Sequence, residues 1–356
     1  MVSRLEVENF RNLESLRLLP STSGLTVIQG DNGAGKTSLL EALVYCSVLR
    51  SFRGVPKEAV IRTGADQASV RCELHYGTRR VDIDVDILAG RRDRAERNRQ
   101  RIDGSRQLLE VLRTTLFTPD DLELAKGSPS LRRDLLDDVI AATRPRLGAE
   151  RMNLDRILRQ RNALLRQLGG RLDDTAAATL DVWDERLAET GERVAVARTE
   201  LTDDLVPLAR EAFAALAPGA GALELHYVCS YEGTLASALA AARPDDLRRQ
   251  LTTVGPQRDE LEIVAGGLDA RTRLSQGRQR CVALALRLAT HRHVTGVTGT
   301  TPVLLLDDAF SELDEPTARA LVNELPSTQA LLTTAGALPP GATPDLVVRL
   351  EKGVLS

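Results

Sequence analysis

The stretch Gln29–Leu43, QGDNGAGKTSLLEAL, decides the fold. An apolar run leads into it, glycines crowd its turn, and helix-forming residues follow. The spacing fits the pattern G-x-x-x-x-G-K-[ST] at Gly30, Gly35, Lys36 and Thr37. Glycines let successive backbone N–H groups point inward, and the positive end of the following helix adds to this field. The stretch therefore predicts a strand–loop–helix that binds nucleotide phosphates.

The residues of this loop divide into those that act through side chains and those that act through the backbone. Lys36 is expected to reach the β and γ phosphates, and the Thr37 hydroxyl is expected to ligate Mg²⁺. A glycine loop that merely turns the chain is the alternative, and the strand before and the helix after favour ATP binding. The other residues expected to bind ATP are Gly30, Asp31, Asn32, Gly33, Ala34, Gly35 and Ser38.

Composition limits the class of protein. A length of 356 residues suggests two domains or one domain with a large insertion, and 42% hydrophobic residues suffice for a packed core. The net charge of −3 gives no overall basic field that would announce nucleic acid. The four cysteines form no C-x-x-C pair, and no apolar run is long enough to cross a membrane. These features predict a cytoplasmic protein without structural zinc.

Hydrophobic periodicity divides the chain into a strand-rich part and a helical part. Two strands are expected within residues 2–30, and period-two alternation predicts an antiparallel pair over 68–90. From about residue 131 to 216 the apolar residues recur at helical spacing, with a break at Gly169 and Gly170. Two helices packed as a hairpin are expected there, and Pro207 should bend or end the second. An ordinary helical subdomain and a true coiled coil both fit.

Two acidic residues end an apolar strand near the C-terminus. The segment VLLLDD, Val303–Asp308, places Asp307 where it can hold the Mg²⁺ shell. Asp308 stands where a general base would polarise the attacking water. A buried strand followed by a helix-capping acid is the alternative. With the glycine loop present, Lys36, Asp307 and Asp308 are the candidate catalytic residues.

A second anion site is expected in the segment LSQGRQR. A serine hydroxyl at the bare N-terminus of a helix attracts anions, although Ser275 is also a good helix cap. The chain's own glycine loop already serves one nucleotide, so this site would bind the γ phosphate of a partner subunit. The segment SELD, a few residues after the acids, favours that interpretation. The residues expected to contact the partner's ATP are Ser275, Gln276, Gly277 and Arg278.

These segments, in this order, resemble the ABC-type ATPase heads, and among them the SMC-related branch and above all the RecF family. Further resemblances are LEVENFRNL at the start, FTPDDLELAKGSPSLRRDLLD and VGPQRDEL. They span nearly the whole chain. The resemblance implies an α/β head, with a P-loop core and antiparallel strands, and an inserted α-helical subdomain bearing a short hairpin. The head would comprise residues 1–125 and 222–356, and the insertion 126–221.

The resemblance also implies a function. The protein would be an ATP-dependent, DNA-binding recombination mediator at gapped DNA, acting in recombinational repair, replication restart and the response to DNA damage. Two heads would sandwich two ATPs, with Arg11 and Asn12 near the nucleotide and Asp314 across the dimer interface. Implied partners are double-stranded DNA near single-strand gaps, a second copy, the RecR mediator and, indirectly, the RecA recombinase.

Three departures from related heads predict a weak ATPase with slow hydrolysis, and stimulation of that ATPase by DNA is expected as well. Asp308 replaces the usual glutamate, Thr334 and Ala335 stand in place of a switch histidine, and Asp120 stands near the place of a glutamine. The nucleotide-binding subunit of an ABC transporter, another SMC-like ATPase, an ATPase–nuclease and a P-loop kinase are the alternatives. The helical insertion disfavours the transporter, and a kinase would leave the Ser-Gln-Gly helix unexplained.

One short segment concentrates positive charge. Arginines outnumber acids there, between a strand and a turn, and a hairpin tip of this kind can reach a phosphate backbone. It has no aromatic residue to stack on bases, so contact with duplex DNA is expected. A solvated loop is the alternative. The DNA-contact candidates are Arg91, Arg92, Arg94, Arg97, Arg99 and Arg101.

Overall fold

The computed structural model describes residues 1–356, which form two compact units. The first unit contains Met1–Asp121, Ala215–Ala217 and Thr290–Ser356. The second contains Leu122–Ala214 and Pro218–Ala289. The sequence predicts a different division, with a head of residues 1–125 and 222–356 and an insertion at 126–221. That division is drawn from the positions of the ATPase motifs, whereas the two units are defined by their compactness. It differs from these units and stays a prediction.

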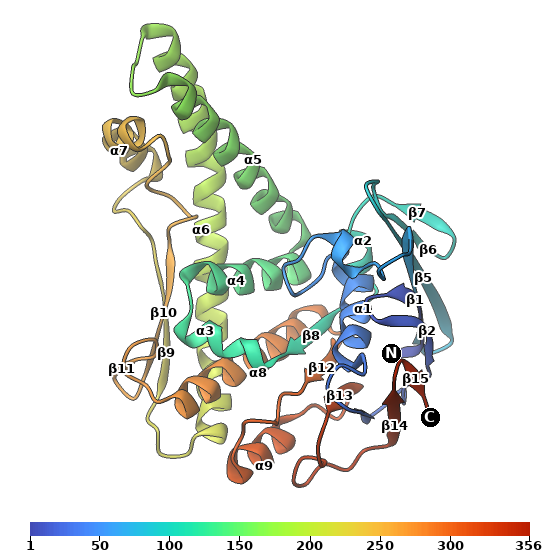
Figure 1. Ribbon diagram of the computed structural model, residues 1–356. Coiled ribbons are helices and arrows are strands. Elements are labelled where there is room, and N and C mark those ends of the chain that lie inside the picture. Colours follow the sequence, from blue (N-terminus) through green and yellow to red (C-terminus); the bar gives the residue numbers. More distant parts are fainter. The chain divides into compact units, whose positions relative to one another are not determined.

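The first unit is built around a sheet whose central strands are parallel (Figure 1). Its strand order is β15-β14-β3-β13-β12-β8, and only β15 runs antiparallel to its neighbour. Strand β12 is buried along its whole length, which explains its uninterrupted apolar sequence. The strands are β3 (Leu25–Gln29), β8 (Thr114–Phe117), β12 (Val303–Asp307), β13 (Ala330–Thr334), β14 (Leu346–Glu351) and β15 (Val354–Leu355).

A second sheet of the same unit is antiparallel, in the order β2-β1-β4-β5-β6-β7. The predicted pairing of the two alternating segments is confirmed, because β4 pairs with β5 in register from Gln67↔Leu88 to Tyr76↔Arg79. The two strands expected within residues 2–30 are present as β1 and β3, but the expected simple turn between them is wrong, because a third strand, β2, lies there. The chain reverses at Arg11, whose φ is 54°, and so forms an extra strand. The strands are β1 (Val2–Phe10), β2 (Leu13–Leu18), β4 (Gln67–Tyr76), β5 (Arg79–Leu88), β6 (Arg94–Arg97) and β7 (Gln100–Ile102).

Helix α1 (Lys36–Val48) follows β3 directly and packs in the core that the two sheets share. Leu39, Leu40 and Leu43 are fully buried, which fits a helix with apolar residues on most of its faces. The smaller helical elements of this unit are η1 (Lys57–Val60), α2 (Arg106–Leu109), η2 (Pro119–Asp121) and α9 (Glu315–Glu324).

The second unit is mainly helical and has a three-stranded antiparallel sheet of its own. The two expected helices are present, and we call α5 and α6 the arm. Helix α8 begins in this unit and ends in the first. The elements are α3 (Leu122–Lys126), α4 (Pro129–Thr143), α5 (Pro145–Leu168), α6 (Asp174–Leu216), β9 (Leu223–Val228), α7 (Leu235–Arg249), β10 (Glu260–Ala265), β11 (Leu268–Asp269) and α8 (Gln276–Thr298).

The leucine repeat of the arm forms its buried seam. Leu154 and Ile157 of α5 pack in one cluster with Leu187 and Val194 of α6. The expectation that Pro207 could end the second helix is wrong, because α6 continues to Leu216. A proline leaves the carbonyl four residues earlier without its helical partner, and here that residue, Asp203, is exposed to water.

Candidate nucleotide-binding site

The turn between β3 and α1 requires glycine at two positions. A Cβ on Gly30 would lie 2.2 Å from the carbonyl oxygen of Leu350, and one on Gly35 would lie 2.6 Å from Leu13 Cδ2. Gly33 and Gly35 also have φ values of 81° and 109°, which side chains disfavour. The loop therefore packs tightly against Leu350 at Gly30 and against Leu13 at Gly35. A Cβ on Gly33, between them, would meet open space.

Lys36 is buried in this loop without a negative partner. Its Nζ donates hydrogen bonds to the carbonyl oxygens of Gly30 at 2.6 Å and Asp31 at 2.9 Å, and the residue is 8% exposed. A buried ammonium group is costly unless an anion compensates it. The two carbonyls satisfy its hydrogen bonds but not its charge, so the side chain suits an incoming phosphate.

Thr37 and Asp307 meet where β12 ends. The Thr37 hydroxyl donates to Asp307 Oδ1 at 2.9 Å, and the Thr333 hydroxyl donates to the same oxygen at 2.7 Å. Burial raises the pKa of Asp307, and the two hydroxyls oppose that shift. No lysine or arginine forms an ion pair with this carboxylate. A carboxylate and a hydroxyl are oxygen ligands of the kind that Mg²⁺ prefers.

The charges of Lys36 and Asp307 show whether this site suits ATP together with Mg²⁺. Lys36 is a buried cation without an anion, and Asp307 is a buried anion without an ion-paired cation. A triphosphate would compensate the first, and Mg²⁺ would compensate the second. The residues present fit both groups. We call Gly30–Ser38, Asp307 and Asp308 the nucleotide site.

Asp308 directly follows β12 in a left-handed conformation with a φ of 48°. Its backbone N–H donates to the carbonyl of Thr333 at 3.2 Å and to the hydroxyl of the same residue at 3.1 Å. These bonds fix the sharp turn at the strand end, while the half-buried carboxylate itself has no hydrogen-bond partner. The side chain is thus free to orient water, as the proposed base must.

The turn between β1 and β2 contacts the glycine loop through Asn12. Its amide donates to the carbonyl of Gly33 at 2.9 Å and accepts from the Ser38 hydroxyl at 3.0 Å. Arg11 points instead to the flank of α1, where its guanidinium binds both carboxylate oxygens of Glu41, at 3.0 and 2.6 Å. Asn12 therefore lies at the nucleotide site, and Arg11 supports the helix that carries it. The other loop residues include Asp31, Asn32 and Ala34, with Ala34 donating to the carbonyl of Asp31.

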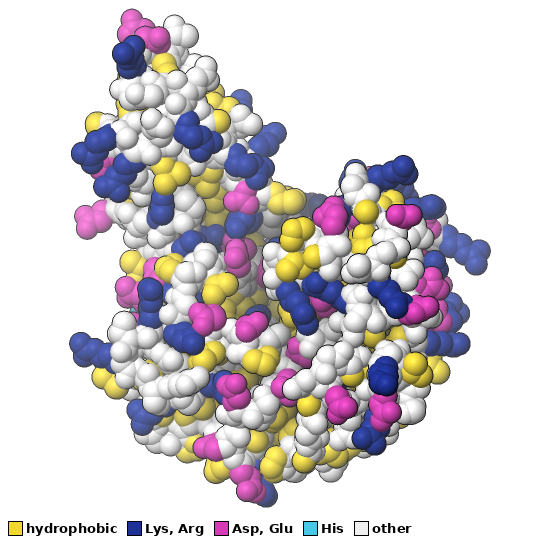
Figure 2. Space-filling model, viewed as in Figure 1, with side chains coloured by type: hydrophobic (Ala, Val, Ile, Leu, Met, Phe, Trp, Pro, Cys, Tyr) yellow, Lys and Arg dark blue, Asp and Glu magenta, His cyan; other side chains and the backbone are white.

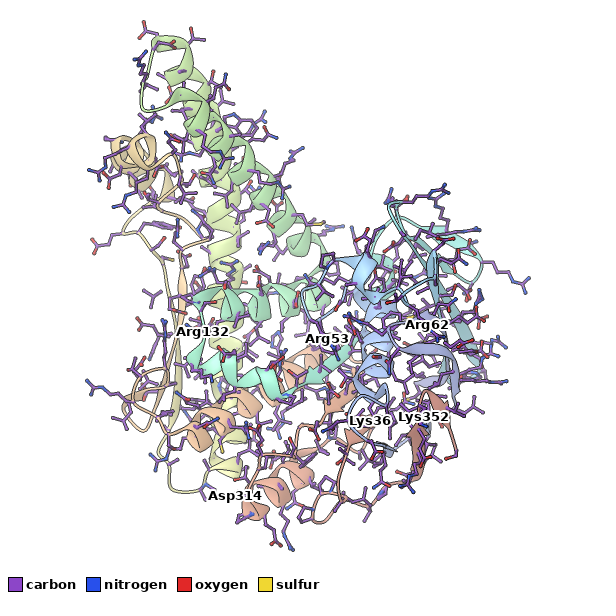
Figure 3. The ribbon with its side chains drawn as sticks, in the orientation of Figure 1. Lys36, Arg53, Arg62, Arg132, Asp314 and Lys352 are labelled. Carbon is purple, nitrogen blue, oxygen red and sulfur yellow. The ribbon has the colours of Figure 1, made fainter.

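Sequence reasoning missed Arg53. Its Nε lies 3.6 Å from Glu41 Oε2. Its positive charge partly opposes the rise that burial causes in the pKa of Asp307. Arg53 is labelled in Figure 3. No spacing rule relates residue 53 to residue 307, so only the fold reveals the proximity. The sequence feature that could have pointed to Arg53 is Glu41, an acid among the leucines and alanines of the helix. Glu41 is fully buried, so its charge needs a cationic partner.

The Ser-Gln-Gly segment lies in the second compact unit, at the start of α8. Ser275 through Arg278 are all exposed, and a Cβ on Gly277 would meet open space. The Ser275 hydroxyl accepts a long hydrogen bond of 3.5 Å from the N–H of Arg278. The segment is presented on the surface, and its serine acts only weakly as a helix cap.

Asp314 is the N-cap of α9. Its carboxylate accepts from the N–H of Thr317 at 2.9 Å, and its bonds with Thr317 lower its pKa. Asp120 is exposed in η2. The structure gives each residue a local position, and their predicted roles toward a partner or a nucleotide stay predictions.

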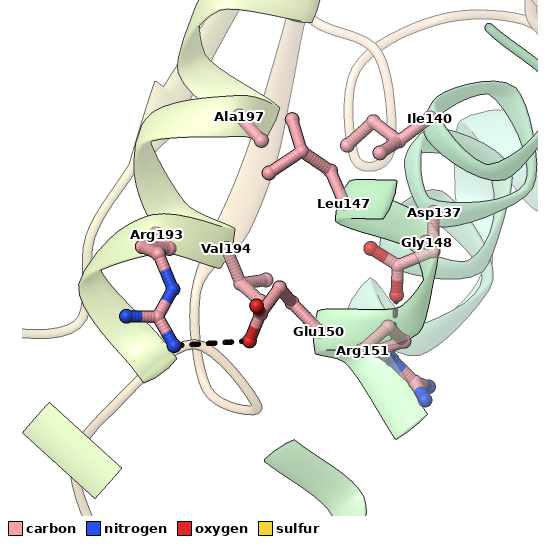
Figure 4. A pocket seen from close by; sticks show the side chains of 9 residues that line it. All are labelled: Asp137, Ile140, Leu147, Gly148, Glu150, Arg151, Arg193, Val194 and Ala197. Carbon is pink, nitrogen blue, oxygen red and sulfur yellow. Dashed lines mark hydrogen bonds and ion pairs between the residues drawn. The ribbon is translucent and has the colours of Figure 1, made fainter. Parts of the chain in front are cut away.

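The second unit has a small pocket between α4, α5 and α6 that does not resemble a ligand site (Figure 4). It has room for about one water molecule. Its charged residues are already paired, since Arg193 binds Glu150 at 3.1 Å and Arg151 binds Asp137 at 2.6 Å. It is lined by Asp137, Ile140, Leu147, Gly148, Glu150, Arg151, Arg193, Val194 and Ala197.

Comparison with known proteins gives the family. The model of the RecF/RecN/SMC N-terminal domain matches residues 1–334. The DNA replication and repair protein RecF of Streptomyces avermitilis is 39% identical over 94% of this chain and 93% of its own length. The chain belongs to the RecF family. Its fold is accordingly a mixed α/β ATPase head like those of RecF and SMC proteins.

Solved structures agree with this assignment. One described as the recombination mediator protein RecF–ATP in the RecFOR pathway is 27% identical, covers 100% of this chain and 96% of its own, and has a TM-score of 0.90. An Smc head domain from Pyrococcus furiosus, with 17% identity and a TM-score of 0.58, covers 100% of this chain and 95% of its own. That second likeness concerns the fold alone. No helix of this RecF-family chain combines the length and apolarity that spanning a bilayer would need.

The arginine-rich segment of this RecF-family chain forms the short hairpin β6–β7. Asn98 and Arg99 make its turn, with φ values of 51° and 65°. Lysine and arginine side chains gather over this end of the antiparallel sheet (Figure 2). Three of the six candidates are engaged, with Arg94 bound to Glu96, Arg97 to Glu110 and Arg92 to Asp103. Those without an ion pair are Arg91, Arg99 and Arg101.

Proposed function

We propose that the protein is an ATP-dependent recombination mediator that binds duplex DNA near single-strand gaps and acts in recombinational repair and replication restart. The observation that carries the ATP step is the pair of buried, uncompensated charges, Lys36 and Asp307. The roles of the RecF relatives in DNA replication and repair and in recombination support the DNA step. RecR and, indirectly, RecA are proposed as its protein partners.

The chain's residues divide the work of hydrolysis. The N–H groups of the glycine loop would hold the phosphates, except those of Gly30 and Ala34, which donate to Thr334 and Asp31. Lys36 would exchange its loop carbonyls for phosphate oxygens, and Thr37 with Asp307 would hold Mg²⁺. Bound Mg²⁺ supplies positive charge to the phosphate oxygens. Asp308 orients the attacking water. Hydrolysis is proposed to be slow, because Asp308 is shorter than glutamate and no histidine stands at Thr334. DNA is proposed to stimulate it.

The exposed Ser275–Arg278 segment supports an ATP-dependent homodimer. A helix N-terminus with an exposed serine and open space at Gly277 suits the γ phosphate of ATP held by a second copy. Asp314 is proposed to lie at the same interface. ATP would thus join the two copies, and its hydrolysis would release them.

The test is the mass of the particle, measured by light scattering with and without ATP and Mg²⁺. The wild type should be a monomer alone and a dimer with ATP. Ser275→Arg should stay a monomer while each chain still binds ATP, because bulk and charge block the partner's phosphate. Thr175→Arg, an equally bulky change at an exposed position of α6, should dimerise normally. A wild type whose mass is unchanged by ATP would contradict the proposal.

A further inference from the structure

The turn between β14 and β15 lies at the edge of the sheet where the glycine loop begins. Strand β14 runs parallel to β3 with Arg349 opposite Gln29, so Leu350 is level with Gly30. Lys352 and Gly353 therefore extend past the end of β3, beside the loop. Ligands of parallel sheets bind outside the carboxyl ends of the strands, which is where this turn lies.

The end of β14 and the turn after it lie against the nucleotide site at two points, one tight and one at ordinary van der Waals distance. The Leu350 carbonyl leaves no room for a Cβ on Gly30, as described above. A Cβ on Gly353 would lie 3.8 Å from the backbone oxygen of Asn12, the residue whose amide binds the loop at Gly33 and Ser38. Figure 3 shows Lys352 near the foot of α1, close to Lys36 in that view.

The residue at the first position of this turn is unusual for its conformation. Lys352 has a φ of 48° and Gly353 a φ of 83°, and two-residue hairpin turns with both φ values positive favour Asn-Gly. A lysine there carries backbone strain that asparagine would relieve. The side chain is exposed and forms no hydrogen bond or ion pair. Lysine is also rare in this chain, which uses it at only four of its 47 basic positions.

The order of the strands shows which part of a nucleotide would lie near this lysine. β12, with Asp307, is on one side of β3 beyond β13, and β14 is on the other. Lys36, Thr37 and Asp307 mark the β and γ phosphates and the metal. The opposite end of the nucleotide, with its α phosphate and ribose, would therefore extend toward Asn12 and the β14–β15 turn.

We infer that Lys352 is a nucleotide-binding residue, whose ammonium group contacts the α phosphate and ribose end of the nucleotide held by the glycine loop. This inference rests on the proposed binding of ATP and adds a contact that no motif marks. Because ATP and ADP share this end, the contact strengthens the binding of both equally. Lys36, in contrast, favours the nucleotide with the longer phosphate chain.

Calorimetric titration of the full chain with ATP and with ADP, in Mg²⁺, tests the assignment. Lys352→Asn removes the charge but suits the turn, so the melting temperature without nucleotide should not fall. Both dissociation constants should rise by roughly three- to tenfold, the range for losing a partly exposed charged contact. Their ratio should stay that of the wild type. Lys352→Arg should recover part of the loss.

Lys126→Asn is the matched control, because Lys126 is an exposed lysine of the second unit, paired only with Glu123. It should leave both affinities unchanged. Unchanged affinities in Lys352→Asn, or a loss confined to ATP, would overturn the inference while leaving the proposed function intact. A wild type that binds neither nucleotide would overturn the proposed function and this inference with it.

Discussion

The nucleotide site and the arm both hold charged side chains away from water, but they balance those charges in opposite ways. In the arm, Arg161 is fully buried and donates to Asp184 at 2.6 Å, Asp246 at 2.7 Å and Thr252 at 2.9 Å. We call these four residues, together with Arg243, the arm cluster. In the nucleotide site, Lys36 and Asp307 have only neutral hydrogen-bond partners.

The difference separates a charge cluster that holds the fold from one that awaits a ligand. The arm cluster joins α5, α6 and α7, with Arg243 adding a second bond to Asp184 at 2.6 Å. Its compensation is internal and permanent. The nucleotide site leaves both charges without an ion pair, which costs stability until phosphates and Mg²⁺ bind. Breaking one charge in each region should therefore give different results.

The largest effect is expected from Arg161→Ala. It leaves Asp246 buried with no cation, so the free energy of unfolding should fall by about 3–5 kcal/mol. Urea denaturation followed by circular dichroism measures this. Arg248→Ala removes an exposed pair with Asp245 and should cost less than about 1 kcal/mol. Equal losses in the two variants would refute the structural role of the arm cluster.

The second effect is expected from Lys36→Met. Without nucleotide, the loss of two hydrogen bonds is offset by removal of a buried charge, so stability should change by no more than about 1.5 kcal/mol. ATP with Mg²⁺ at one hundred times its Kd should stabilise the wild type by about 2.7 kcal/mol. The variant should lose most of that gain, which thermal melts with and without ATP would report.

A fall in nucleotide-free stability as large as that of Arg161→Ala would show that Lys36 supports the fold rather than waits for a phosphate. The comparison between the two regions would then fail.

The nucleotide site was far more predictable from the sequence than the arm cluster, for a physical reason. The glycine loop is local, since its chemistry needs Gly30, Gly35 and Lys36 within seven residues. Arg161 lies among many arginines of an amphipathic helix, and its partner Asp246 is 85 residues away. No period or spacing marks such a pair. Arg53 escaped notice for the same reason, because its electrostatic partner Asp307 belongs to a distant strand.

Prediction of the fold succeeded where a repeated hydrophobic pattern extended over a whole segment. It failed where the course of the backbone depended on a single residue. Alternation gave β4 and β5, and the leucine repeat gave the arm. Strand β2 was missed because the reversal depends on one left-handed residue, Arg11, which no glycine or proline marks. The prediction that Pro207 could end the helix failed because apolar burial on either side of it, at Leu205 and Ala209, stabilises α6 by more than one lost hydrogen bond costs.

The smallest effect concerns the β6–β7 hairpin, where the same distinction between paired and unpaired charges selects the DNA contacts. Arg91, Arg99 and Arg101 are exposed and form no ion pair, whereas the other three candidates already neutralise acids. Arg132 of α4 offers a poor substitute, because it is 3% exposed and bound to Glu260 at 2.8 Å. An unpaired arginine can bind a DNA phosphate without first breaking an ion pair within the protein.

Replacing Arg91, Arg99 and Arg101 together by alanine should therefore lower the slope of log K against log salt for duplex DNA by up to ~2.7, at ~0.9 per lost phosphate contact. Over each doubling of salt this amounts to about 1 kcal/mol. The matched triple variant of Arg92, Arg94 and Arg97 should change the slope less. Each of these arginines already forms an ion pair with an acidic residue, namely Asp103, Glu96 or Glu110. ATP affinity should be unaffected in both. Equal slopes for the two variants would mean that ion pairing does not select the contacts, and two slopes equal to that of the wild type would reduce the hairpin to solvated surface.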